Sequence, residues 1–336
     1  MVLLSLSKVF HFRKKKYDLI SGKFQQTSSN NPDDQKWAYF REDMMFHVSH
    51  SLVHRIFEAV RDRNHQLEGD YRGRINSLFF YAHQQMMRKA NIELATNGLP
   101  EIVPLSLDEW EKSLGPGITV GWYAWKDLGG RIDNCNIKEV NSTAFDDFKN
   151  NFYDKMMKVL EKAKDEEAVA DAIVDRTSGK SYHSRGHALI SSLCHDNKDC
   201  GKGHRCMGLM EASEASARDP VFFRWHGHLE YILQRFRDTK LPVYEKKDFP
   251  LADGVKVKKV RTSLSKKETG GKWNLNNILV TFMEDTVVDH HEGSSVLYNR
   301  LNHVPFKYKI NLDNPNKSTK KVIVRLWLGL LNTRDK

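Results

Sequence analysis

Two histidine pairs with a spacing of four residues constrain this chain more than any other feature of its sequence. His50 and His54 lie in the segment HSLVH, and His183 and His187 lie in HSRGH. On an α-helix, residues four apart lie on one face, one turn from each other. Each pair can therefore direct two imidazoles at a single point if its segment is helical.

One further histidine follows each pair in another segment with a helical pattern. His83 lies in FFYAHQQ after the first pair, and His226 lies in FFRWHGH after the second. Neutral imidazole suits copper, zinc, iron or nickel, whereas calcium and magnesium prefer oxygen ligands. Neither pair contains the glutamate of the HExxH zinc-protease motif. The pattern predicts two groups of three histidines for transition-metal ions, and the alternative is chance spacing in a chain with 15 histidines.

Hydrophobic spacing predicts a mainly helical region from Arg41 to about Asp238. The expected helices are one that begins after the acidic pair Glu42-Asp43, followed by 76–93, 144–170, 183–193 and 220–237. The segment 94–143 is rich in proline and glycine, so we expect loops with short elements there.

The pattern changes near residue 246. Apolar residues alternate with other residues at Val255 and Val257, at Ile278 and Val280, at Phe306, Tyr308 and Ile310, and at Val322, Val324 and Leu326. This period of two, interrupted by turn residues, predicts antiparallel strands. Fewer than ~100 residues remain from this point, which is small for a complete β-sandwich.

These patterns predict an α+β multidomain fold. We expect an N-terminal remnant or linker at 1–40, a mainly α domain with a four-helix core at 41–245, and an antiparallel β-sandwich-like domain, incomplete at its end, at 246–336.

Composition excludes several classes of partner. The net charge is +10, but the 53 basic residues are spread along the chain without interleaved aromatics, so we expect no nucleic-acid partner. No apolar stretch reaches the ~18–20 residues of a membrane span. The N-terminal segment MVLLSLSKVF is no clear signal peptide, because the basic run at 13–16 follows its apolar part.

The four cysteines are too few for a disulfide scaffold. Three of them lie in CHDNKDCGKGHRC (194–206), which resembles a small metal knuckle without the spacing of a standard zinc site. A local disulfide or free thiols is the interpretation we favour. In an extracellular protein one bridge could form among these three, and Cys135 could pair with the remainder.

Several longer strings resemble the arthropod hemocyanin, prophenoloxidase and hexamerin superfamily. They are WAYFRED (37–43), FFYAHQQMMRK (79–89), ATNGLP (95–100), RDPVFFRWH (218–226), HVPFKYKINLDN (303–314) and VRLWL (324–328), in the family's order. The resemblance implies two copper ions in a type-3 dicopper centre. It assigns copper A to His50, His54 and His83, and copper B to His183, His187 and His226. Storage hexamerins usually lack these ligands.

The resemblance also implies the chemistry. Two Cu(I) ions can reduce O2 to a peroxide held between them, and three neutral histidines per ion leave a position open for oxygen. A phenol oxidase and an oxygen carrier share this centre. The family places a helical domain with an aromatic plug ahead of the copper domain, whereas here only residues 1–40 precede the RED triplet. We therefore expect a phenoloxidase of the catechol oxidase or tyrosinase type, which oxidises o-diphenols to quinones. The alternatives are a hemocyanin-like reversible oxygen carrier and a hexamerin-like storage protein.

Three positions depart from the family pattern. Residues 51–53 are Ser-Leu-Val where tryptophan and further histidines are usual, and Ser184 stands where asparagine is common. Phenoloxidases often carry a glutamate where this chain has Ser213. Glu214 and Glu211, on either side of it, are the candidate general bases for a phenol.

The remaining expectations concern surroundings and partners. Phe79, Phe80, Phe222, Phe223 and Trp225 are expected to form either a dry pocket around the centre or ordinary core packing, or both. The implied partners are O2 and a small phenol, with a homo- or hetero-oligomer possible in the family. The implied location is the extracellular fluid (haemolymph).

Two other histidines lie close to the expected ligands along the chain. His47 is expected on the helix surface or behind the ligands, and His228 is expected to point away from His226, because positions two apart on a helix do not share a face.

Overall fold

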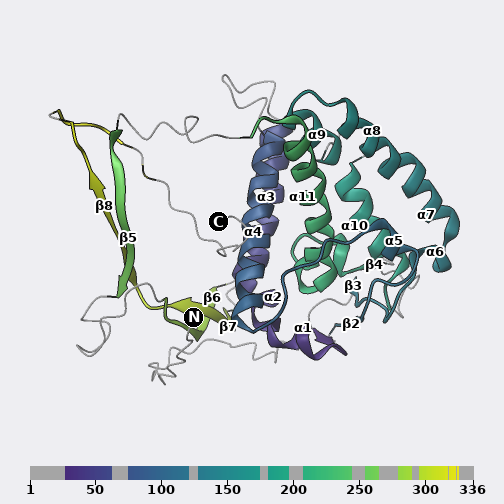
Figure 1. Ribbon diagram of the computed structural model, residues 1–336. Coiled ribbons are helices and arrows are strands. Elements are labelled where there is room, and N and C mark those ends of the chain that lie inside the picture. Colours follow the sequence, from purple (N-terminus) through teal and green to yellow (C-terminus); the bar gives the residue numbers. More distant parts are fainter. Residues whose placement is uncertain are drawn as a thin grey trace. The chain divides into compact units, whose positions relative to one another are not determined.

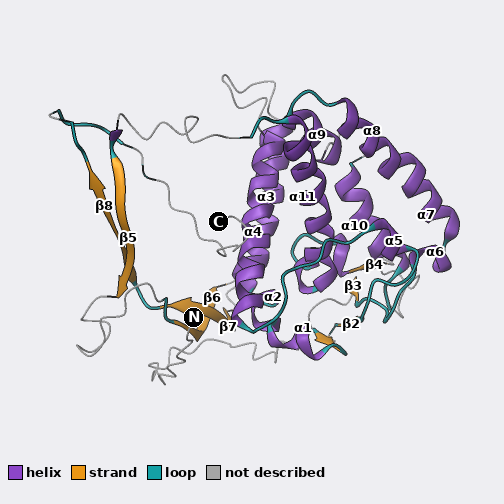
Figure 2. Ribbon diagram, viewed as in Figure 1, coloured by secondary structure: helices purple, strands orange, loops and turns teal. Residues whose placement is uncertain are grey.

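The computed structural model describes residues 27–62, 75–120, 128–174, 181–196, 207–243, 254–264, 279–289, 295–316, 318–322 and 324. The chain divides into two compact units, with the border between Leu241 and Pro242. The first is mainly helical and the second consists of strands (Figures 1 and 2), so the fold is α+β, as the sequence predicts. No helix in the described part of the chain is long and apolar enough to cross a membrane.

The helical unit contains four long helices among many shorter elements. Its α-helices are α1 (Pro32–Lys36), α2 (Ala38–Arg41), α3 (Met44–Asp62), α4 (Ile75–Thr96), α5 (Leu107–Trp110), α6 (Ile137–Val140), α7 (Ser142–Phe148), α8 (Asp154–Lys162), α9 (Glu166–Val174), α10 (Tyr182–Leu193) and α11 (Pro220–Lys240). Its other elements are the π-helical turn η2 (Lys149–Tyr153), the 3-10 turns η3 (Leu209–Glu211) and η4 (Ser216–Arg218), and the two-residue strands β1 (Ser28–Ser29), β2 (Ile118–Thr119), β3 (Leu128–Gly129) and β4 (Met207–Gly208).

The long helices pack around one another through a single apolar core. Helix α4 packs against α3, α9 and α11, and these helices run side by side in Figure 1. The core is rich in aromatic residues, and Trp110, Phe145, Phe222 and Phe236 are at most 1% exposed. Burial of such rings supplies much of the free energy of folding of a domain of this size.

Side-chain caps fix where the two C-terminal long helices begin. Asp219 accepts a hydrogen bond from the Val221 N–H of α11, and Pro220 occupies the first turn, as the sequence predicts. The same carboxylate forms a buried ion pair with Arg131, with an Nε–Oδ2 distance of 2.8 Å. At the start of α10, the Ser181 hydroxyl accepts from the Ser184 N–H and donates to the Ile173 carbonyl.

The expectation of one helix over 144–170 is wrong. Helices α7 and α8 continue into each other through η2, but the helix ends at Lys162 and α9 begins at Glu166. The reason is a cap within the predicted helix: the Asp165 carboxylate accepts from the Ala168 N–H, and two glutamates follow it in the first turn of α9. An N-cap carboxylate followed by acidic residues is typical of the start of a helix, but here it lies within a run of charged residues that also fits a continuous helix.

The second unit forms two separate antiparallel strand pairs among its described residues. The strands are β5 (Lys256–Leu264), β6 (Thr281–Asp289), β7 (Ser295–His303) and β8 (Phe306–Asp313). Strand β5 pairs with β8, from Lys256 opposite Asp313 to Leu264 opposite Phe306, and β6 pairs with β7.

The predicted strand positions agree with the second unit in part. The alternating residues Val257, Phe306, Tyr308 and Ile310 lie in these strands. Val322 and Val324 lie in no strand, and Ile278 and Leu326 fall outside the described residues.

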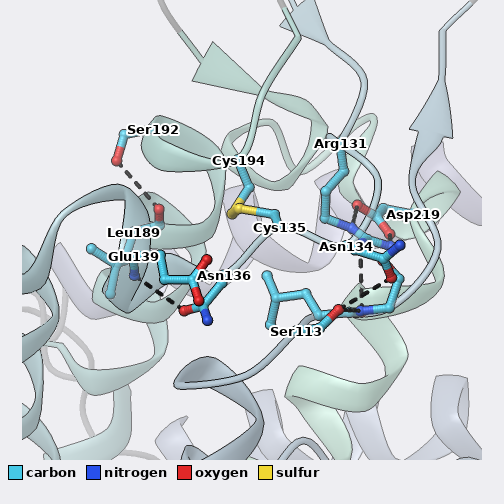
Figure 3. Close-up of a disulfide and its surroundings, with 12 residues drawn as sticks. Ser113, Arg131, Asn134, Cys135, Asn136, Glu139, Leu189, Ser192, Cys194 and Asp219 are labelled. Carbon is cyan, nitrogen blue, oxygen red and sulfur yellow. Dashed lines mark hydrogen bonds and ion pairs between the residues drawn. A yellow bond between two sulfur atoms is a disulfide. The ribbon is translucent and has the colours of Figure 1, made fainter.

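A disulfide joins Cys135 to Cys194, at the C-terminal end of α10 (Figure 3). Their Cα atoms are 5.7 Å apart and both residues are buried. Cys194 is therefore the cysteine of 194–206 that pairs with Cys135, which agrees with the alternative in which Cys135 pairs with one of these three. Cys200 and Cys206 lie outside the described residues.

We expect loss of this disulfide to reduce stability substantially. It closes a loop of 59 residues, for which the chain-entropy estimate is about 4 kcal/mol. The Cys135→Ala/Cys194→Ala double variant should therefore lose about 2–4 kcal/mol of unfolding free energy, measured by urea denaturation without reductant. Reductant should then change its stability much less than that of the original chain. Equal stability of the two proteins without reductant would contradict the role of the bridge.

Candidate metal centre

Four helices bring the six histidines of the sequence pattern together inside the helical unit. His50 and His54 lie on α3, His83 on α4, His183 and His187 on α10, and His226 on α11. All are buried: His54 and His187 are 9% exposed and the others 4% or less. Two of the helices thus contribute a pair of histidines one turn apart, the other two contribute one histidine each, and all six side chains meet in the interior of the unit.

The first three imidazoles converge through their Nε2 atoms. The Nε2 of His50 lies 3.0 Å from that of His54 and 3.2 Å from that of His83. Two nitrogens bound to one ion at ~2.0–2.1 Å are about 3.3 Å apart at the tetrahedral angle. The observed separations therefore fit three ligands of a single ion.

The second three imidazoles adjoin the first. The ligand nitrogens of His183 and His226 lie within 4.8 Å of each other and of His83, and His187 joins this set through His226. The Nε2 atoms of His187 and His226 are 3.2 Å apart, and the ring centroid of His183 lies 4.6 Å from that of His187 and 5.1 Å from that of His226. The rings of His83 and His226, one from each group, stack with centroids 4.5 Å apart. The two groups therefore share one interior space, and two ions held there would be neighbours.

Backbone carbonyls fix the orientation of three of these rings. The Nδ1 atoms of His50, His83 and His187 lie 2.6, 2.8 and 2.7 Å from the carbonyl oxygens of Ser213, Phe79 and Met210. A carbonyl can only accept, so each Nδ1 carries the proton and each Nε2 presents a lone pair to the centre. Such hydrogen bonds are typical of imidazoles that bind metals.

Electrostatics favours a metal ion over protons at this point. His50 and His83 both carry the proton on Nδ1, so their facing Nε2 lone pairs, 3.2 Å apart, repel unless a positive charge lies between them. Burial, aided by neighbouring histidines, lowers the pKa of His50 and His226 well below the usual value, and burial lowers the pKa of His83 to about 4. Protonated rings are therefore disfavoured near neutral pH, and neutral imidazole is the form that copper, zinc, iron or nickel binds.

Two nearby histidines lie outside this cluster. The Nε2 of His47 donates to the Arg41 carbonyl at 2.6 Å, and burial lowers the pKa of His47 to about 3. The Nε2 of His228 lies 3.0 Å from the hydroxyl of Tyr182, and burial lowers the pKa of His228 to about 4. The ring of His228 therefore faces Tyr182, in keeping with the expectation from its position on the helix.

Gly186 allows α10 to approach α11 closely. A Cβ atom at this position would collide with the indole ring of Trp225, which directly precedes His226 in the chain. The glycine inside HSRGH therefore sets the separation at which the histidines of the two helices meet. We did not single it out from the sequence, although an isolated glycine in a helical pattern often marks close packing.

The aromatic residues expected around the centre divide between the two suggested roles. Phe79 and Phe222 contact imidazoles, with centroids 4.2 Å from His83 and 4.3 Å from His226. Phe223 and Trp225 pack against other core aromatics, Trp37 and Trp110. A cavity of about 10 Å³, close to the minimum for one water molecule, adjoins the cluster and is lined by Phe79, Phe80, His83, Gln84, Met87, His226, Leu229 and Glu230.

The two candidate bases differ in their relation to the cluster. The Ser213 hydroxyl lies 3.0 Å from the Glu214 carboxylate and 3.5 Å from the Ser51 hydroxyl, and the Ser213 carbonyl accepts from His50. Glu214 thus accepts from the side chain of the residue whose backbone carbonyl orients His50, and Glu214 itself is exposed. Glu211 is exposed at the end of η3. The orienting carbonyls of Met210 and Ser213 had no sequence signal, because every residue carries a carbonyl.

Two family models match the chain across the part that builds this cluster. "Hemocyanin, copper containing domain" matches residues 4–164, and "Common central domain of tyrosinase" matches residues 107–239. Together with the two histidine groups, they define the helical unit as a dicopper unit of the type-3 class. Both models and the relatives described next support the hemocyanin and phenoloxidase superfamily of type-3 copper proteins for this chain.

Individual relatives include both functional branches of this superfamily. Hemocyanin G chain of Aphonopelma sp. is 26% identical over 91% of this chain and 50% of its own length. Phenoloxidase 3 of Drosophila erecta is 24% identical over 90% of this chain and 47% of its own length. A crystal structure of a crustacean hemolymph type prophenoloxidase superposes with a TM-score of 0.62 at 20% identity, over 85% of this chain and 48% of that one. The chain spans about half the length of these relatives.

We expect Gly186→Ala to damage both stability and metal binding. The added methyl must displace Trp225, and overpacking of this kind costs about 1–3 kcal/mol. Urea denaturation should show the loss, and metal analysis should show fewer copper ions per chain because His226 shifts with its neighbour.

Gly227→Ala is the matched control on α11. Its Cβ would meet its nearest neighbour at 3.5 Å, an ordinary contact, and alanine in a helix interior is more stable than glycine by ~0.5–1 kcal/mol. Similar losses in the two variants would contradict the role of Gly186.

Proposed function

We propose that the six histidines are the copper ligands of this chain. His50, His54 and His83 would hold one ion, and His183, His187 and His226 the other. The support is the convergence of buried imidazole lone pairs described above, in a chain whose family is defined by dicopper domains. The same convergence argues against a copper-free storage protein, because such a protein would need no facing lone pairs in its core.

We further propose that the chain oxidises small phenols, such as o-diphenols, to quinones with O2. Two copper ions at this position supply the electron transfer to O2 that such a reaction needs. The protein's part is to hold the ligand rings, and Phe79 and Phe222 keep water from the ligand nitrogens.

The observation that favours oxidation is the Glu214–Ser213–His50 connection. It places an exposed carboxylate on the residue next to the one whose carbonyl orients His50, and a phenol that approaches the first group from the surface could give up its proton there. A reversible carrier of O2 has no need of such a base.

An oxygen carrier is the second candidate function. It is favoured by the depth of the cluster, whose rings are at most 9% exposed, and by the size of the adjoining cavity, about 10 Å³. A space of this size suits a molecule as small as O2 and excludes a phenol. Several relatives are hemocyanin chains.

The proposed setting follows from the relatives. A hemolymph type prophenoloxidase shares the fold, which supports an extracellular location such as haemolymph. The proposed small-molecule partners are O2 and a phenol, and assembly into a homo- or hetero-oligomer is part of the proposal.

We expect His54→Ala to lower the copper content from two ions per chain to about one, because the first group loses one of its three nitrogens. Metal analysis of the purified protein checks this. His47→Gln is the control, because His47 is a buried histidine of the same helix that bonds to a carbonyl instead. It should retain both ions. Two ions in the His54→Ala variant would contradict the ligand assignment.

We expect Glu214→Gln to slow the oxidation of a catechol by about 10²-fold, the lower end of the range for general-base catalysis. Its copper content should not change, and Glu211→Gln should retain the original rate. The measurement is quinone formation in air, with copper content determined on the same samples.

Three outcomes are informative in this experiment. An unchanged rate in Glu214→Gln would remove Glu214 from the proton path while leaving the oxidase proposal in place. Absence of quinone from a chain with two copper ions and a reversible, O2-dependent absorption band would favour the carrier. Absence of copper would contradict both functions.

A further inference from the structure

The carbonyl that orients His50 lies in a short segment between the turns η3 and η4. His50, on α3, donates through Nδ1 to the Ser213 carbonyl oxygen at 2.6 Å, although the two residues are 163 positions apart in the chain. Ser213 itself lies in no helix or strand. The geometry of this hydrogen bond therefore depends on how the segment is held to α3.

An ion pair joins the segment to the start of α3. Arg218, the last residue of η4, donates to the Glu42 carboxylate, with an Nε–Oε2 distance of 2.9 Å. Glu42 directly precedes Asp43, whose carboxylate caps α3 by accepting from the Phe46 N–H at 2.9 Å. The pair thus connects the beginning of the helix that carries His50 to the segment that carries the acceptor of its proton.

Both partners of the pair have further hydrogen bonds that fix their orientation. The Nη1 of Arg218 donates to the Glu214 carbonyl at 3.1 Å. The second carboxylate oxygen of Glu42 accepts from the Thr27 backbone N–H at 2.9 Å and from the Thr27 hydroxyl. The guanidinium therefore bridges the Glu42 carboxylate and the peptide group next to the one that accepts from His50.

The pair is shielded from solvent, and its surroundings are firm. The side chains of Arg218 and Glu42 are 11% and 12% exposed. The backbone carbonyl of Arg218 also accepts from the buried guanidinium of Arg41, at the end of α2. Removal of one partner of a shielded pair leaves the other charge poorly solvated, so its effect is larger than for a pair in open solvent.

We propose that Arg218, through its pair with Glu42, is a positioning residue that sets the direction of the His50 imidazole at the first metal group. This role rests on the proposed function, because it takes His50 as a ligand. With Arg218 in place, the Ser213 carbonyl keeps the proton of His50 on Nδ1, and the Nε2 lone pair stays directed at the group. Without Arg218 the segment shifts relative to α3, and this group loses affinity for its ion.

The second group is held independently of this pair. The carbonyl that orients His187 belongs to Met210 in η3. Gly208, directly before η3, forms two hydrogen bonds with the Ser191 hydroxyl of α10, at 2.8 and 3.0 Å. The acceptor for His187 is thus tied to the helix that carries His187 itself, so loss of Arg218 should weaken only one of the two ions.

The test compares variants of the full chain by their retention of copper. Each purified protein is loaded with Cu(I) without air and equilibrated with increasing concentrations of a Cu(I) chelator, and the copper that remains is measured. In Arg218→Gln we expect one ion to be lost at about tenfold lower chelator concentration than in the original chain, the lower end of the range for removal of a group that supports a ligand. The other ion should be retained as before.

Three further variants separate positioning from a general loss of packing. Arg237→Gln is the matched control, because it removes another arginine–glutamate pair of the helical unit, with Glu166 of α9, and it should retain both ions. Arg218→Lys keeps a positive charge beside Glu42 and should recover part of the lost affinity. Glu42→Gln keeps an acceptor for Thr27, and it should match Arg218→Gln without a further loss in the double variant, because the two residues act as one unit.

Nuclear magnetic resonance of the metal-free chain gives a readout that does not depend on copper. The protein is labelled with nitrogen-15 histidine, and the Nδ1–H signals are assigned by their absence in His50→Gln and His187→Gln. We expect the Nδ1 proton of His50 to exchange with solvent at least several-fold faster in Arg218→Gln than in the original chain. The Nδ1 proton of His187 should exchange at the same rate in both.

The outcomes distinguish this role from the function on which it rests. Equal retention of both ions in Arg218→Gln and in the original chain, with equal exchange at His50, would overturn the positioning role alone. Equal weakening of both ions would also overturn it, because a general loss of packing does not discriminate between the groups. An original chain that binds no copper would overturn the proposed function, and the role of Arg218 at a metal group with it.

Discussion

The structure depends on the way in which neutral imidazole lone pairs face one another in a buried space. The Nε2 contact between His50 and His83 would be repulsive in an empty, neutral core, because both rings carry their proton on Nδ1. Protonation would relieve the repulsion, but burial opposes it, as the lowered pKa of His83 shows. A metal ion relieves it without a proton. The folded helical unit therefore favours the binding of metal cations that coordinate nitrogen.

The surrounding fold holds this arrangement by fixing helix ends and helix separations. The buried Arg131–Asp219 pair fixes the start of α11, two turns before His226. Ser181 fixes the start of α10 next to His183. Gly186 then sets how closely these helices approach.

The difference between an oxygen carrier and a phenol oxidase lies outside the ligand set. Both need the same six imidazoles, so the deciding features are the depth of the cluster and the groups at its edge. Here a deep centre with a small cavity occurs together with the exposed carboxylate of Glu214, next to the residue whose carbonyl orients His50.

The sequence by itself determined the ligand candidates and the helices that carry them. A spacing of four residues places His50 with His54, and His183 with His187, on single helix faces whatever the rest of the fold does. Local signals also determined the start of α11, because Pro220 and its cap act within one turn. The same local reasoning overlooked the cap at Asp165, because the charged amphipathic pattern is compatible with one long helix as well as with two helices separated by a break.

Only the tertiary structure decided which groups meet across the fold. The pairing of Cys135 with Cys194, the contact of His50 with the Ser213 carbonyl, and the hydrogen bond of Tyr182 to His228 join residues that are distant in the chain. No periodicity encodes such contacts, because they depend on how whole helices pack. The convergence of the two histidine groups has the same origin. The spacing of four residues places the two side chains of each pair on one helix face, and the packing of the helices brings these faces together.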